Sequence, residues 1–331
     1  MKRILTGDNA TGTHHLGHLI GSINNRVKHQ LEYETFIIIA DMHALAYPKY
    51  INPDYNFKDA VYEILLGNLS AGLDPERVYF FSESSIPEIF EIATIFSNFV
   101  THSRALRVPT IKDEIREKNL GENYSLGFIN FPVLMSADIL SVQADLVPVG
   151  EDQVPMIELA RDIVEKINTT YKANLKFPNV ELSSHPRLVG TDGSVKMTKS
   201  IGNAIFLTDS TDKVYEKIMK MYTDPNRLRA TDPGKVAGNP VFIYHDAFNK
   251  NIEEVSDLKE RYTAGKVGDV EVKEKLFTAI EETLEPIRKR RKDFEDTDLL
   301  DEIIKKGNQK VREEASKTLK LIKENLKIMT L

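Results

Sequence analysis

The stretch TFIIIAD, residues 35–41, constrains the fold most, because its unbroken apolar run indicates a strand buried on both faces. Such strands occur in parallel sheets that helices cover on both sides. The neighbouring segments alternate in the same way, with predicted strands at 2–6 and 78–84 and predicted helices at 16–31, 61–72 and after Pro87. The alternation predicts an α/β fold with a doubly wound parallel sheet.

The second part of the chain has a different character. A helix at 131–140, a strand at 145–150 and a helix at 152–167 are predicted to continue the sheet, which we expect to end near Gly150 or somewhat beyond. Residues 110–127 have weaker apolar periodicity. After Gly193 the pattern is charged and helical, notably at 272–296 and 314–329. We therefore predict an α/β domain at 1–205 and an all-helical domain at 206–331, with the last helices, about 295–331, packing back on the first domain.

Composition excludes several classes of site and partner. The 331 residues include no cysteine, which excludes disulfides, cysteine zinc sites, iron-sulfur ligation and thiol nucleophiles. A formal net charge of −6 gives no overall attraction to nucleic acid, so an RNA contact would need a local basic surface. The N-terminus lacks an apolar signal segment, and the run at 36–40 is too short to cross a bilayer. We expect a cytoplasmic protein without a membrane contact.

The stretch ATGTHHLGHLIG, residues 10–21, holds three histidines in five positions and has three interpretations. They are ordinary polar residues, or a metal site on His14 and His18, or part of a phosphate site. The metal site lacks both a third ligand and the glutamate of H-E-x-x-H. The phosphate site uses the free N–H groups where the first strand meets the first helix, and the glycines allow a close backbone approach. Because the P-loop and G-x-G-x-x-G patterns are absent, a nucleotide site of another kind is indicated.

A second stretch, GTDGSVKMTKSIGNA at 190–204, supplies mobile positive charge. Lys196 and Lys199 lie between Gly193 and Gly202, so a loop with two ammonium groups could close over phosphates. Taken alone, the pattern is more typical of a solvated loop than of a phosphate-binding one.

Together these two stretches resemble the class I aminoacyl-tRNA synthetases. His15-Leu16-Gly17-His18 is similar to their HIGH signature, and KMTKS at 196–200 is similar to their KMSKS loop. The resemblance implies a Rossmann-like nucleotide-binding domain, ATP as substrate with Mg²⁺ on its phosphates, and no metal held by the protein itself. It makes His15, His18, Lys196 and Lys199 catalytic and gives His14 no role. The ATP contacts that it implies are Asn9, Ala10, Thr11, Gly17, His18, Gly150, Glu151, Asp152, Lys196, Met197, Thr198, Lys199 and Ser200.

Three further stretches resemble one branch of that class, tryptophanyl-tRNA synthetase. They are VGEDQVPMIELARDI at 149–163, FPVLMSADIL at 131–140 and IADMHA at 39–44. An indole pocket needs apolar walls and one acceptor for a buried N–H, and Asp138 lies on the same helical face as Met135. The resemblance assigns Asp138 to the indole, Gln153 to the substrate ammonium, and Met135, His43 and Gly7 to the pocket.

Two departures from the family pattern concern the substrates. Phe131 stands where the family usually has tyrosine, so a hydroxyl near the substrate ammonium is missing. Asn9 and Ala10 replace the commoner Pro-Ser or Pro-Thr, which leaves the ATP contacts of residues 9–11 less defined. Neither departure removes a charge that catalysis needs.

The implied reaction joins tryptophan to ATP as an adenylate and then transfers the amino acid to the terminal adenosine of tRNA(Trp). The resemblance also implies a homodimer and a helical domain that reads the anticodon, with IRKRRK at 287–292 either a contact for the RNA or a solvated face. Three alternatives stay open. They are a tyrosyl-tRNA synthetase, which GEDQ and LMSAD disfavour, a nucleotidyltransferase on the same fold, and a synthetase-like binding protein without catalysis.

The KMTKS stretch generates a first prediction. Lys199→Ala should lower the rate of amino-acid activation far more than the affinity for tryptophan, because the ammonium group follows charge onto the leaving pyrophosphate. Single-turnover assays measure that rate, and an unchanged rate would remove the loop from catalysis.

Overall fold

The computed structural model describes residues 1–117, 120–121, 123–182, 188–194, 197, 201–224, 227, 229 and 231–329. Its centre is a sheet of five parallel strands, β1 Arg3–Asn9, β2 Glu34–Ala40, β3 Val78–Ser82, β4 Leu146–Val149 and β5 Asn179–Leu182. The order β3-β2-β1-β4-β5 confirms the predicted doubly wound sheet. Strand order reverses between β1 and β4, where Ile4 pairs with Leu146.

Helices cover both faces of the sheet. The chain between β1 and β4 forms α1 Leu16–His18, α2 Asn24–His29, α3 Asp41–Leu45, α4 Phe57–Ser70, α5 Pro87–Ser97, α6 His102–Leu106, α7 Pro109–Glu117 and α8 Leu126–Ser141, and α9 Val154–Tyr171 joins β4 to β5. Side chains of β2 alternate between two cores, with Ile37 and Ile39 packing toward α4 and Phe36 and Ile38 toward α5, α8 and α9. Because both faces of β2 are buried in a core, its sequence is an uninterrupted apolar run.

The structure differs from the predicted elements in four places. The helix predicted at 16–31 is divided by a π-helical segment, Leu19–Ile23, between α1 and α2. Helix α7 lies in the segment of weak periodicity, and α8 begins five residues before the predicted start at 131. Strand β5 lies well beyond Gly150, and its four half-exposed or exposed residues at the sheet edge give little apolar signal.

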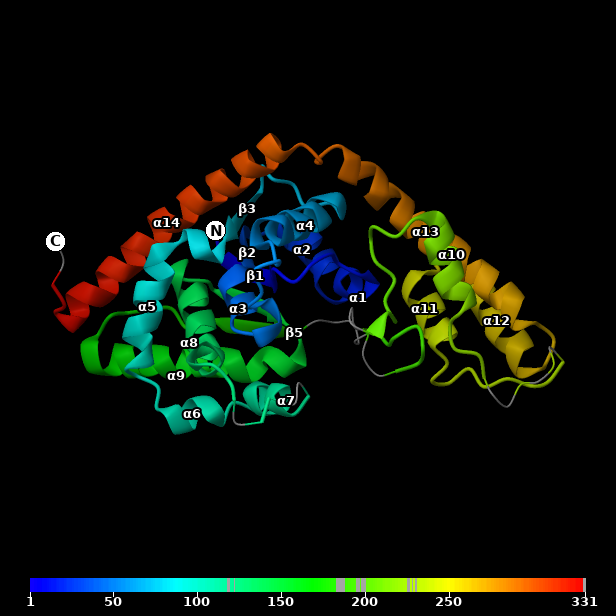
Figure 1. The fold of residues 1–331 in the computed structure, drawn as a ribbon, viewed down its shortest axis with the longest axis horizontal. Coiled ribbons are helices and arrows are strands. Elements are labelled where there is room, and N and C mark those ends of the chain that lie inside the picture. Colours follow the sequence, from blue (N-terminus) through cyan, green and yellow to red (C-terminus); the bar gives the residue numbers. More distant parts are fainter. Residues whose placement is uncertain are drawn as a thin grey trace.

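The remaining chain is helical, as predicted. It forms α10 Thr211–Met219, α11 Pro240–Phe248, α12 Ile252–Thr263, α13 Asp269–Lys292 and α14 Thr297–Leu326. Helices α10 to α13 lie to one side of the sheet, whereas α14 runs back across the sheet unit beside β3 and α5 (Figure 1). No described helix is both long and apolar enough to cross a membrane.

Contacts at close range fix α14 to the sheet. The backbone N–H of Ser82 donates to Asn308 Oδ1 at 3.1 Å, and Thr318 Oγ1 donates to the carbonyl of Ser141 at 3.0 Å. Gly307 allows this approach, because a Cβ added there would lie 1.7 Å from the carbonyl oxygen of Phe80. The unpaired edge of β3 is thereby covered.

Gly307→Ala should therefore destabilise the protein. The added methyl group meets backbone rather than a movable side chain, and overpacking of this kind costs about 1–3 kcal/mol. Gly21→Ala is the matched control, since a Cβ there meets nothing within 4 Å. Equilibrium unfolding in urea measures both, and equal stability of the two variants would contradict the close packing of α14.

Candidate active site

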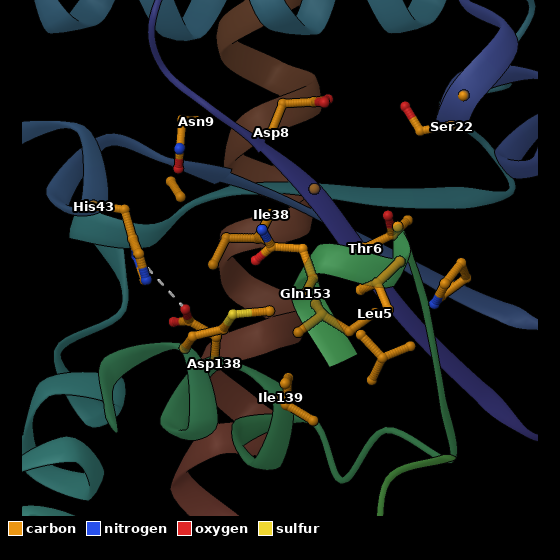
Figure 2. A pocket seen from close by; sticks show the side chains of 18 of the residues that line it. Leu5, Thr6, Asp8, Asn9, Ser22, Ile38, His43, Asp138, Ile139 and Gln153 are labelled. Carbon is orange, nitrogen blue, oxygen red and sulfur yellow. Dashed lines mark ion pairs between the residues drawn. The ribbon is translucent and has the colours of Figure 1, made fainter. Parts of the chain in front are cut away.

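A cavity of about 330 Å³ opens where the strand order reverses, at the carboxyl ends of β1 and β4. Open α/β sheets bind ligands at this position. Eight of the residues singled out from the sequence line it: Gly7, Asn9, His43, Phe131, Met135, Asp138, Gly150 and Gln153. Figure 2 shows His43 and Asp138 facing each other at one side of this space. Segments far apart in the chain thus meet in one site.

Asp8, at the end of β1, lines the cavity, and its largely buried carboxylate is held in place by Arg26 and His14. The Asp8 carboxylate is bound by the guanidinium group of Arg26, whose side chain also donates to Asn68 Oδ1 and to the carbonyl of Gly7, both at 2.9 Å. His14 Nε2 lies 3.2 Å from Asp8 Oδ2. Burial works to raise the pKa of Asp8, but Arg26 and His14 hold that pKa well below its usual value. His14, which the resemblance leaves without a role, is therefore part of the support of the site.

The two histidines of the HLGH stretch organise the first turn of α1. Gly17 N–H donates to His15 Nδ1, and His15 N–H donates to His18 Nδ1, each at 3.1 Å. Their rings lie 3.8 Å apart between centroids. A Cβ on Gly17 would lie 2.9 Å from the His15 ring, so glycine is required for this arrangement. The two histidines lie at the start of α1, where free backbone N–H groups favour an anion.

The segment that follows the KMTKS stretch pairs with the histidine stretch. Leu16 N–H donates to the carbonyl of Ile205 at 2.9 Å, and Leu207 N–H donates to that of His14 at 3.0 Å. The Met197 side chain is buried, and a Cβ on Gly17 would lie 3.6 Å from its sulfur. The two motifs therefore meet in the fold. Lys196, Thr198, Lys199 and Ser200 lie outside the described residues.

At the apolar end of the cavity, Asp138 presents a buried acceptor. Its side chain on α8 lies beside Met135, and its Oδ1 atom accepts no hydrogen bond from the residues that the structure describes. Burial, reinforced by the nearby Glu83, raises the pKa of Asp138 well above its usual value, against the effect of His43. Because buried polar atoms are normally hydrogen-bonded, this oxygen is a site for a donor from a ligand.

Glu83, which the sequence analysis did not single out, holds His43 beside that acceptor. Glu83 is fully buried and accepts from the backbone N–H groups of Met42 and His43 at 3.1 Å and from His43 Nδ1 at 2.8 Å. His43 Nδ1 also lies 3.9 Å from Asp138 Oδ2. Burial lowers the pKa of His43, but the Glu83 carboxylate outweighs this effect and raises the pKa to about 9. The only signal in the sequence was an acidic residue directly after a buried strand.

Within the part of the chain that the structure describes, His43, Glu83 and Asp138 also bring three possible metal-ligand atoms within 4.8 Å of one another. The imidazole nitrogen in this group is the one engaged by Glu83. We therefore interpret these three side chains, which we call the His43 network, as a charge network that includes the Asp138 acceptor.

The other residues singled out from the sequence occupy mixed positions. Gln153 lines the cavity, and its amide donates to Asp152 Oδ2 at 3.0 Å. Phe131 is buried with its ring 5.9 Å from that of His43. The residues that do not line the cavity are Ala10, Thr11, His15, Gly17, His18, Glu151, Asp152 and Met197. Tyr47 and Glu114 also line it, and no motif in the sequence pointed to either of them.

The basic stretch IRKRRK at 287–292 is largely engaged within the chain. Arg288 pairs with Glu281, Arg290 donates to the carbonyl of Ser70 at 2.7 Å, and Arg291 pairs with Glu63 at 2.7 Å. These contacts fix α13 to α4 and leave Lys289 and Lys292 exposed.

Comparison with known proteins gives consistent matches over nearly the whole chain. Residues 1–285 match the family described as tRNA synthetases class I (W and Y). A tryptophan–tRNA ligase of Borreliella burgdorferi is 49% identical and one of Treponema pallidum 45% identical, each over 98% of this chain and over 93% and 96% of the relatives. The tryptophanyl-tRNA synthetase of Campylobacter jejuni, solved with ADP and tryptophan, is 29% identical, with a TM-score of 0.84 over 98% of this chain and 99% of that one.

The His43 network makes stability depend on pH. The pKa of His43 lies near 9 in the folded protein against 6.5 ordinarily, so the charged imidazole stabilises the fold fully below pH 6.5, and this contribution disappears as pH rises through 9. The difference corresponds to about 3 kcal/mol.

The free energy of unfolding of the wild-type protein should thus fall between pH 6.5 and 9, and that of His43→Gln should fall much less. Urea unfolding across that range measures the effect, with the exposed His102→Gln as control. The same pH dependence in His43→Gln and wild type would show that the imidazole carries no charge in the fold.

Proposed function

Because the chain belongs to the class I tRNA synthetases of the tryptophan and tyrosine type, we propose that it is the ATP-dependent ligase that attaches L-tryptophan to tRNA(Trp). Two steps make up the reaction. The tryptophan carboxylate attacks the α-phosphate of ATP, forming a carboxyl–phosphate bond and expelling pyrophosphate. The adenylate then passes its acyl group to the terminal adenosine of the tRNA, releasing AMP.

The unpartnered Oδ1 atom of Asp138 is the observation that carries this proposal. Indole has one N–H and a large apolar body, and the cavity offers one buried acceptor beside the Met135 thioether and the Ile139 side chain. Binding of tryptophan would supply the missing donor. A site that depends on such a bond rejects analogues without the donor, phenylalanine included.

Activation needs positioning and charge stabilisation rather than a protein nucleophile. The turn between β1 and α1 would receive the phosphates on its backbone N–H groups, with His15 and His18 as donors and Lys196 and Lys199 following charge onto pyrophosphate. Gly150, Glu151 and Asp152, at the end of β4, would lie against the ribose.

Magnesium is proposed to arrive on ATP. Among the residues that the structure describes, the only converging group of three His, Asp or Glu ligands is the His43 network, at the amino-acid end of the cavity. A protein cage for Mg²⁺ at the phosphate end therefore does not fit, whereas binding through phosphate oxygens is usual for this ion.

Residues 206–331 are proposed to bind the tRNA, with the exposed Lys289 and Lys292 of the basic stretch as candidate contacts. A homodimer is also proposed, with the exposed apolar side chains of Leu45 and Leu126 as candidates for its interface. Ser125 Oγ donates to the carbonyl of Ala46, which joins the segments that carry these two residues. The proposed place of action is the cytoplasm.

Amino-acid-dependent exchange of labelled pyrophosphate into ATP tests the function. We expect exchange with tryptophan and none with tyrosine or without amino acid. Asp138→Ala should raise the KM for tryptophan about 10- to 100-fold, since it leaves a buried N–H unpaired. Glu165→Ala, at an exposed site on α9, is the control. Exchange with tyrosine would assign the chain to the sister activity, and no exchange would favour a nucleotidyltransferase or a binding protein.

A further inference from the structure

Tyr55, in the segment between α3 and α4, contacts the turn that leads from β1 into α1. Its Oη atom donates to the carbonyl oxygen of Ala10 at 2.6 Å. Ala10 is fully buried, so this carbonyl depends on a partner within the protein. No motif pointed to Tyr55, because the contact joins residues 45 positions apart.

The local sequence NPDYNF, residues 52–57, fixes the place of Tyr55. The backbone N–H of Tyr55 donates to the carbonyl of Asn52 at 3.0 Å, which closes a turn with Pro53 at its second position. The next residue, Asn56, caps α4, because its Oδ1 atom accepts from the backbone N–H of Asp59 at 3.2 Å. Tyr55 therefore lies between a proline turn and a capped helix, and both restrict its backbone.

Two aromatic rings pack against the Tyr55 side chain. The ring centroids of Tyr50 and Phe57 each lie 4.8 Å from that of Tyr55. Burial raises the pKa of Tyr55, so the phenol keeps its proton and can donate at neutral pH. With its backbone and its ring both restricted, Tyr55 is a rigid support for Ala10.

The bond from Tyr55 completes the support of one peptide group in the turn. The carbonyl of Ala10 belongs to the same peptide as the N–H of Thr11, which donates to the carbonyl of Asn9 at 2.7 Å. The N–H of Ala10 donates to the carbonyl of Ala40 at 3.3 Å. Alanine does not fix its own φ as proline does, so these hydrogen bonds set the direction in which the chain leaves Asn9. Asn9 itself lines the cavity.

Helix α4 also supports the other end of the turn. The buried His14 ring packs against Gly67, where an added Cβ would clash with Nδ1 of that ring. Tyr55 lies just before α4 and Gly67 lies in its last turn. The helix and the segment before it therefore hold the chain at Ala10 and again at His14, on either side of Gly12.

We propose, on the basis of the proposed function, that Tyr55 is a positioning residue for ATP, whose hydroxyl group fixes the turn that receives the phosphates. Tyr55 does not line the cavity, so it acts through Ala10 rather than by touching ATP. A turn that is already ordered before ATP arrives lowers the cost of ordering it on binding. We therefore expect an effect on phosphate binding and none at the indole end of the cavity.

Tyr55→Phe removes only the hydroxyl group and tests this role. Isothermal titration calorimetry should show that ATP with Mg²⁺ binds about fivefold or more weakly, the factor that corresponds to one typical hydrogen bond. Adenosine, which lacks the phosphates, and tryptophan should bind as they do to the wild-type protein. Binding of tryptophan can be followed by its own fluorescence, because the chain contains no tryptophan. In pyrophosphate exchange, the KM for ATP should rise by the same factor and the KM for tryptophan should not change.

Tyr50→Phe is the matched control. It removes a hydroxyl group from the ring that packs on Tyr55, and within the described residues that hydroxyl makes no hydrogen bond to the turn. Unchanged affinity of Tyr55→Phe for ATP, even with a lower free energy of unfolding, would mean that the bond serves the fold alone. Equal losses for ATP, adenosine and tryptophan would mean a general disturbance of the site. Either result overturns the inference.

The proposed function fails separately. Wild-type protein that binds ATP but catalyses no tryptophan-dependent exchange of pyrophosphate would overturn the ligase activity. Weaker binding of ATP, but not of adenosine, by Tyr55→Phe would still support the role of Tyr55.

Discussion

The buried ion pair between Asp8 and Arg26 is the interaction on which the arrangement of the site depends. It joins the carboxyl end of the central strand to α2, and through Asn68 to α4, in a region where an uncompensated charge would cost several kcal/mol. His14 completes the compensation from the loop that leads into α1. The position of the HLGH turn relative to the cavity therefore follows from the requirement to neutralise one carboxylate.

The two ends of the cavity differ in polarity. Beside the strand end, on the turn that leads into α1, backbone N–H groups and the paired rings of His15 and His18 are suited to a highly charged ligand. At the helix end, an apolar ring-shaped ligand must be recognised in a dry environment. There His43, held in place by Glu83, supplies positive charge beside Asp138, which limits the cost of a buried carboxylate that must accept one hydrogen bond.

Local patterns predicted the parallel sheet, because the apolar pattern of each buried strand and each amphipathic helix lies within one continuous segment of the sequence. The same patterns failed at β5, which is short and partly exposed, and at α7, which is largely polar. Motifs placed His43, Asp138 and Gln153 in one cavity. Glu83 was not found, because its contact with His43 joins residues 40 positions apart, and no local spacing encodes such a contact.

A crystal structure of the protein with bound tryptophan would show whether Asp138 accepts a hydrogen bond from the indole. We predict that the indole nitrogen lies within hydrogen-bond distance, about 2.7–3.2 Å, of Asp138 Oδ1, with the ring between Met135 and the end of β1. An indole bound elsewhere, or one whose nitrogen faces away from Asp138, would contradict the assignment of this cavity to tryptophan.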